Sequence, residues 1–174
     1  MSRLAALVLG AFVLLAGLYG LSTLVNSRDD AGVSRSSGPG TREPDRGAAH
    51  RPAGDRSEAD APTSGPHAPD LVPRDARALS DDAILHALEL GDVVLVYPGT
   101  APPAQLRAVQ EEVAGPFDPE LAAAGQAVVL ARVPGASGIQ ALAWRRRLRA
   151  SGAGDPSILT FAEHWLGRGL DGSH

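Results

Sequence analysis

The sequence contains no cysteine and no lysine among its 174 residues, and only 4% of the residues are aromatic. Without cysteine, the chain cannot form a disulfide framework, a thiolate-ligated zinc site, an iron–sulfur cluster or a thiol nucleophile. Without lysine it cannot contain the phosphate-binding motif G-x-x-x-x-G-K-[ST], and the serine hydrolase motif G-x-S-x-G is also absent. The net charge of −4 gives no reason to expect a nucleic acid as partner. We therefore expect a protein that is not an enzyme, with no catalytic residue and no residue that binds an organic cofactor.

The chain begins with a long apolar run, because residues 4–25 include no charged side chain. As a helix they would be about 33 Å long, enough to span a hydrocarbon core of about 30 Å. No small-x-small cleavage site follows the run, so residues 1–25 predict an uncleaved signal anchor rather than a cleaved signal peptide or a buried soluble helix. The flanking charges favour a single pass through the cell membrane, with the N-terminus cytoplasmic and the remaining chain extracytoplasmic.

A polar stretch follows over residues 26–60, in which Val33 is the single large aliphatic residue and no residue is aromatic. Such a segment buries too little apolar surface to offset the entropy lost on ordering. The stretch therefore predicts a disordered linker that contains His50. The tail, residues 171–174, is expected to be disordered as well.

Residues 61–170 are expected to form one domain, since a hydrophobic core can form only there. Ser80 can cap a helix over residues 81–90 that stops at Gly91. A strand over the same residues, with alternate side chains on one face, is the alternative.

The other segments of this domain show clear periodic patterns. The last two predicted strands are expected to pair in antiparallel fashion across a turn over residues 134–138. The fold class expected is therefore α+β, with a small mixed β-sheet of about three strands covered by helices. The predicted elements are a strand over 93–97, a helix over 102–114, strands over 127–133 and 139–148, and a helix over 156–166.

Four arginines lie close together near the end of the last predicted strand. On a strand their side chains would alternate between two faces. We therefore expect a solvated end of the sheet rather than a phosphate-binding site. The residues are Arg145, Arg146, Arg147 and Arg149.

Histidine and carboxylate side chains are the candidate metal ligands. If residues 81–90 are helical, His86 and Glu89 are three residues apart and project to the same side. His67 ends a string with two prolines and a glycine, which restricts its backbone. His164 has the pattern of a surface or helix-edge histidine. The candidate metal site is therefore His67, His86 and Glu89, with copper or zinc as the ion.

Two short strings carry a resemblance to a known family. They are Thr-Ser-Gly-Pro-His, which ends at His67, and His-Ala-Leu-Glu, which starts at His86. With the strand that ends in Tyr97 and the final Gly-Arg-Gly, the chain resembles the bacterial domain of unknown function family 3105 over residues 61–169. The resemblance implies an N-terminal membrane segment, a variable linker and one extracytoplasmic domain.

The chain departs from the family pattern at one position that bears on metal binding. The family pattern His-x-Leu-Glu-His-Gly has a second histidine where this chain has Leu90. The resemblance therefore implies that a metal site here has lost a ligand. We expect a membrane-anchored, non-catalytic interaction or accessory module whose protein partner is unknown. The alternatives are a weakened copper or zinc site and, less favoured, a hydrolase that uses His86 and Glu89.

Overall fold

The computed structural model describes residues 38–52 and 60–170, which belong to the compact unit Gly38–His174. The expected membrane anchor over residues 4–25 and the tail 171–174 lie outside the described residues. Among the helices that are described, none is both long enough and apolar enough to cross a membrane.

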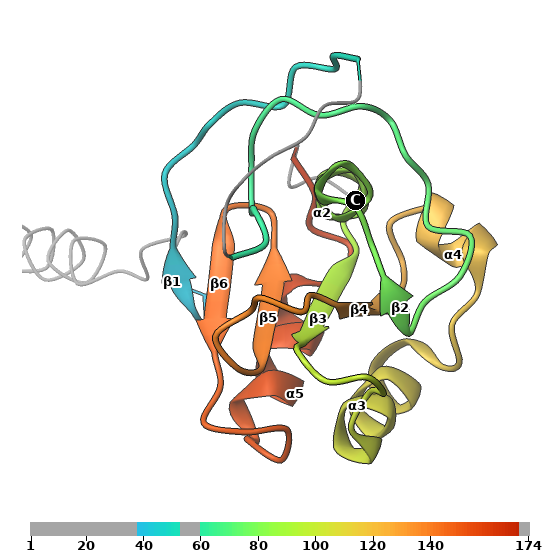
Figure 1. The fold of residues 1–174 in the computed structure, drawn as a ribbon, viewed down its shortest axis with the longest axis vertical. Helices are drawn as coiled ribbons and strands as arrows, with labels where there is room; N and C mark the ends of the chain where they lie inside the picture. The colour runs from blue at the N-terminus through green and yellow to red at the C-terminus, as the bar shows by residue number, and fades with distance from the viewer. Residues whose placement is uncertain (1–37, 53–59, 171–174) are drawn as a thin grey trace, which may run out of the picture. The chain divides into compact units, whose positions relative to one another are not determined.

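The described residues form one mixed sheet of six strands with helices on both faces (Figure 1). In chain order, the strands are β1 (Thr41–Arg42), β2 (Arg77–Ala78), β3 (Val93–Tyr97), β4 (Val128–Arg132), β5 (Gln140–Ala143) and β6 (Arg146–Arg149). The order across the sheet is β1-β6-β5-β3-β4-β2. β3 pairs in parallel with β4 and in antiparallel fashion with β5, and β5 pairs with β6. The α+β prediction is confirmed, whereas the expected three strands are six.

The helices begin and end at clear signals in the sequence. They are α2 (Asp81–Leu90), α3 (Ala104–Ala114), α4 (Pro119–Ala123) and α5 (Ser157–Trp165). The hydroxyl of Ser80 accepts a hydrogen bond from the Ala83 amide at the start of α2, and Gly91 ends the helix with a φ of 121°. The helical prediction for residues 81–90 is therefore confirmed over the strand. α4 lies between the predicted helix over 102–114 and the predicted strand over 127–133, where the sequence analysis placed no element.

The central strands are buried on both faces, which explains their nearly continuous apolar sequence. Successive side chains of β3 point to opposite faces, so Val94 and Val96 pack with α2, while Val93 and Leu95 pack with α3 and α5. α2 thus covers one face of the sheet, and α3 and α5 cover the other. The site described below lies on the α2 face.

The predicted pairing of the last two strands is wrong. β4 and β5 are not neighbours, because each pairs with a different side of β3. The segment expected as one strand over residues 139–148 is broken by a turn at Trp144 and Arg145, after which β6 returns along β5. Arg145 has a φ of 59°, which is uncommon for a residue with a side chain. No glycine or asparagine marks this turn in the sequence.

The expected disordered linker contains an ordered part, residues 38–52, which we call the strap. β1 adds to the sheet beside β6, with Thr41 opposite Arg147. From there the strap runs towards α2 (Figure 1), where His50 forms a β-bridge with His67. Apolar content alone predicted disorder here, but the strap is held by backbone pairing to an edge strand and by ion pairs.

These ion pairs also correct the prediction of a solvated arginine end. Arg145 pairs with Asp45 at 2.9 Å, Arg147 with Glu43 at 2.5 Å, and Arg149 with Asp60 at 2.8 Å. Arg146 lies over the ring of Trp165, 4.7 Å from its centroid. The arginine run therefore fastens the preceding polar segment onto the sheet.

A buried carboxyl group lies between α2 and the sheet. Asp92 is 1% exposed, and its Oδ1 accepts a hydrogen bond of 2.8 Å from the Ala127 amide at the start of β4. Its Oδ2 has no hydrogen-bond partner in the described part of the chain. Burial raises the pKa of Asp92 from 3.8 to about 8. Asp92 therefore keeps its proton in the folded protein at neutral pH.

Asp92→Asn should raise the melting temperature at pH 8 by at least about 5 °C, or about 1 kcal/mol, and change it much less at pH 4. The full linkage between the pKa values of 3.8 and about 8 sets an upper limit of about 5 kcal/mol. The unfolded carboxyl group ionises near 3.8 and the folded one only near 8, so the wild-type unfolding free energy falls as the pH rises between these values. Thermal melts followed by circular dichroism measure the difference. Asp118→Asn at the exposed N-cap of α4 is the control, and an equal shift at both pH values would contradict the prediction.

Candidate metal centre

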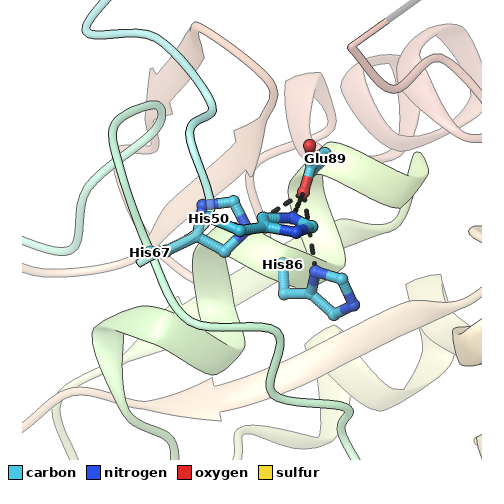
Figure 2. A group of neighbouring side chains, drawn as sticks. All are labelled: His50, His67, His86 and Glu89. Atoms are coloured by element: carbon cyan, nitrogen blue, oxygen red, sulfur yellow. Dashed lines mark hydrogen bonds and ion pairs between the residues drawn. The ribbon is translucent and has the colours of Figure 1, made fainter. Parts of the chain in front are cut away.

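Four side chains from three segments converge beside α2 (Figure 2). His50 comes from the strap, His67 from the loop before β2, and His86 and Glu89 from α2. One potential ligand atom from each of them lies within 4.8 Å of all the others. The structure therefore brings the three predicted ligands together and adds a fourth that the sequence analysis missed.

One carboxylate oxygen of Glu89 lies at the centre of the cluster. Its Oε2 is 3.0 Å from Nε2 of His50, 3.0 Å from Nε2 of His67 and 3.5 Å from Nδ1 of His86. The three imidazole rings lie close together, with centroids 5.2 to 5.8 Å apart. Three nitrogens and one oxygen thus point into a single small volume.

His67 is the fully buried member of the cluster, with no exposed surface. Its Nδ1 lies 3.0 Å from the carbonyl oxygen of Gly65. A carbonyl can only accept, so Nδ1 carries a hydrogen and donates it to Gly65, and Nε2 is the nitrogen that faces the cluster. Neither this Nε2 nor the buried Nδ1 of His86 makes a hydrogen bond. Buried nitrogens that converge without hydrogen bonds are suited to a cation.

The charges within the cluster match those that a metal site needs. Burial, followed by the charge of His67, lowers the pKa of His86 and favours its neutral form. Burial opposes ionisation of Glu89, but a hydrogen bond from His50 and the charges of the histidines hold its pKa below the usual range. These shifts favour the neutral imidazole of His86 and the carboxylate of Glu89, which are the ligating forms of the two side chains.

Close backbone packing fixes the end of α2 that carries His86 and Glu89. The Leu170 amide donates to the carbonyl oxygen of Glu89 at 3.0 Å, and the Gly167 amide donates to that of Gly91 at 2.9 Å. A Cβ atom at Gly169 would collide with the Glu89 carbonyl, and one at Gly125 would collide with the Leu90 carbonyl. The final Gly-Arg-Gly string therefore packs against the C-terminal end of α2 and fixes its position.

The Thr-Ser-Gly-Pro-His string holds the strap as well as supplying His67. The hydroxyl of Thr63 donates to Glu43 at 2.8 Å, and that of Ser64 donates to the Pro44 carbonyl at 3.0 Å. Backbone hydrogen bonds then join both sides of His67 to the strap, since the Arg51 amide donates to its carbonyl and its amide donates to Ala49. These contacts place His50 beside His67.

The missed ligand lies where sequence spacing gives no signal. His50 belongs to a segment whose composition predicts disorder, and 49% of its side chain is exposed. Leu90, where the resemblance implied a lost ligand, is not part of the cluster, and the fourth donor is His50 from the strap. His164 lies apart from the cluster, beside Trp165. The sequence did contain one sign that the strap is ordered. Its acidic residues Glu43 and Asp45 have partners of opposite charge in the arginine run.

Comparison with known proteins gives one match. The family model described as "Protein of unknown function (DUF3105)" matches residues 56–171. The match includes His67, His86 and Glu89, while the strap with His50 precedes it. No curated protein and no solved structure matches the chain.

Gly125→Ala should lower the free energy of unfolding by about 2 kcal/mol, because the new Cβ both meets the Leu90 carbonyl and sits on a backbone with a φ of 70°. Thermal melts in the presence of a chelator measure the loss. Gly152→Ala is the matched control, since nothing lies within 4 Å of its added Cβ, and its effect should stay within about 1 kcal/mol. Equal melting temperatures for the two variants would contradict the close packing of Gly125 against the end of α2.

Proposed function

Because this chain belongs to the DUF3105 family of proteins of unknown function, its function has to be inferred from the site, and we propose that it binds one transition-metal ion. The ligands are His50, His67, His86 and Glu89. The observation that supports this most directly is the fully buried Nε2 of His67, which faces Glu89 at 3.0 Å without a hydrogen bond. A buried polar atom of this kind costs free energy unless a partner satisfies it.

The spacing of the donor atoms supports a single ion. In a tetrahedral site with Zn–N bonds of about 2.0 Å, neighbouring ligand atoms are roughly 3.3 Å apart. The distances from Glu89 Oε2 to the three nitrogens are 3.0 to 3.5 Å. An ion could therefore enter with side-chain adjustments alone, which keeps the cost of organising the site low.

The donor types select the kind of ion. Imidazole ligands suit zinc, copper, iron and nickel, whereas calcium and magnesium prefer oxygen ligands. Three imidazoles and one carboxylate, without any thiolate, fit zinc or copper(II), and these are the two ions that we propose. The backbone carbonyl of Gly65 orients His67, as second partners of metal-bound histidines commonly do.

We propose a non-catalytic role, as an interaction or accessory module whose ion holds three segments of the chain together. In this proposal, residues 4–25 anchor the chain in the cell membrane and the domain lies on the extracytoplasmic side. In the alternative, the cluster serves the fold alone, through contacts between Glu89 and the histidines. The two proposals differ in how the cluster responds to metal.

Titration of the full chain with zinc or copper(II) should show uptake of one ion per chain. His67→Ala should weaken binding by about 100-fold or more, beyond the roughly 10–100-fold typical when an outer partner of a metal ligand is lost. Isothermal titration calorimetry measures the stoichiometry and affinity. His164→Ala outside the cluster should bind as the wild type does; uptake of neither ion, or equal binding by both variants, would refute the site.

His86→Ala should remove the stabilisation that metal supplies. At an ion concentration 100 times the dissociation constant, the wild type should gain about 2.7 kcal/mol of unfolding free energy. Thermal melts with zinc and with chelator measure this gain for both proteins. If His86→Ala lowers stability equally with and without zinc, the cluster serves the fold alone and the metal proposal fails.

A further inference from the structure

We propose that Glu43, which is not a ligand, is a positioning residue that sets the metal affinity by holding His50 in place. This inference rests on the proposed metal site. It concerns the strap, which is the part of the site outside the residues that the family model matches. The ion in turn should hold the strap on the domain.

His50 depends on the strap for its position. Half of its side chain is exposed, and its segment joins the domain near the cluster through the short β-bridge to His67. The other three ligands, in contrast, belong to firmly packed parts of the domain. His86 and Glu89 lie on α2, and His67 lies on a buried loop. The fourth ligand is therefore the one whose position can be lost while the others stay in place.

One attachment of the strap before His50 is built on a buried arginine, and we call it the clasp: Glu43, Arg147 and Thr63. Arg147 is 5% exposed and contacts both carboxylate oxygens of Glu43, with Nε at 2.5 Å and Nη2 at 3.1 Å. The hydroxyl of Thr63 donates to the same carboxylate at 2.8 Å. A bidentate pair at a buried arginine is strong and directional.

Arg147 has further partners that connect the clasp to the domain. Its Nη1 donates to the side chain of Gln140, and its Nη2 donates to the Ala61 carbonyl at 2.7 Å. Hydrogen bonds from Arg147 and Thr63 outweigh the effect of burial and hold the pKa of Glu43 below its usual range. The clasp therefore stays ionised at neutral pH and joins the strap to β5, β6 and the loop before His67.

A second ion pair of the strap provides a matched comparison. Asp45 pairs with Arg145 at 2.9 Å, but 46% of the Asp45 side chain is exposed. Exposed ion pairs contribute little to stability, whereas loss of one partner from a buried pair leaves an uncompensated charge. Glu43 and Asp45 lie two residues apart on the same segment, so they differ in burial rather than in distance to His50.

The physical link between clasp and ion is a linkage equilibrium. If the strap is docked for only a fraction of the time, the apparent affinity of the site falls in proportion. By reciprocity, an ion that binds His50 together with the domain ligands must favour the docked strap by the same factor. A change at Glu43 should therefore act on the ion only while His50 is present.

The test is a double-mutant cycle on the full chain, with zinc as the probe. Glu43→Gln should weaken zinc binding by about tenfold in the wild-type background, in the range of outer partners of metal ligands. In the His50→Ala background the same substitution should change the affinity less than twofold. Asp45→Asn should change it less than twofold in both backgrounds, as the matched control.

The outcomes separate this inference from the metal proposal. If zinc fails to bind the wild type, the proposed function falls and this inference falls with it. If zinc binds but Glu43→Gln weakens binding equally in both backgrounds, the metal site stands and the positioning role is refuted. An effect of Asp45→Asn as large as that of Glu43→Gln would also refute a specific role for the clasp.

Two further measurements cover the case in which Glu43→Gln unfolds. Thr63→Val removes one donor to Glu43 while the arginine pair remains, and it should give a smaller loss of affinity that again disappears in the His50→Ala background. Hydrogen exchange offers a readout in the unmutated protein: zinc should slow exchange of the Glu43 amide, which donates to the Arg145 carbonyl. Exchange at Glu43 that is unaffected by zinc would overturn the inference.

Discussion

The ion pair between the buried Arg147 and the partly buried Glu43 is the contact on which the arrangement of the site depends. Through its three nitrogens, Arg147 reaches the strap, the β5 side chain of Gln140 and the carbonyl of Ala61. It thereby fixes the starting points of the two segments that lead to His50 and His67. A lysine could not replace it, because a single ammonium group does not offer a planar fork of donors. The clasp is thus a geometric constraint as much as an electrostatic one.

The other half of the site is rigid for a different reason. α2 is capped by Ser80, packs on the sheet, and ends against backbone segments that approach it closely at Gly125 and Gly169. The helix therefore presents His86 and Glu89 in a fixed orientation, while polar contacts bring His50 to them. The packing of α2 therefore fixes the positions of His86 and Glu89, whereas the ion pairs of the strap fix the position of His50.

Local signals predicted the parts of the fold that depend on local chemistry. Ser80 and Gly91 delimit α2, and the β-branched run of β3 marks the centre of the sheet. The strap could not be predicted in the same way, because Glu43 and Arg147 are 104 positions apart and composition reports only apolar burial. The turn at Arg145 was missed because a residue with a side chain occupies a position with positive φ, where the backbone amide donates to Thr63. The three ligands found from the sequence lie in the two recognisable motifs, whereas His50 lies in neither.

The absence of cysteine gains a structural meaning from this arrangement. A disulfide is one way in which a small domain can fasten a peripheral segment, because the cross-link limits the entropy of the unfolded chain. Here the segments that carry His50, His67 and Glu89 meet at one point, so a bound ion would close the loops between them and act as a cross-link. Closing a loop of about 15 residues is worth roughly 3 kcal/mol in the chain-entropy model. Unlike a disulfide, such a link is reversible, so a bound ion would strengthen the attachment of the strap at His50 and its loss would weaken that attachment.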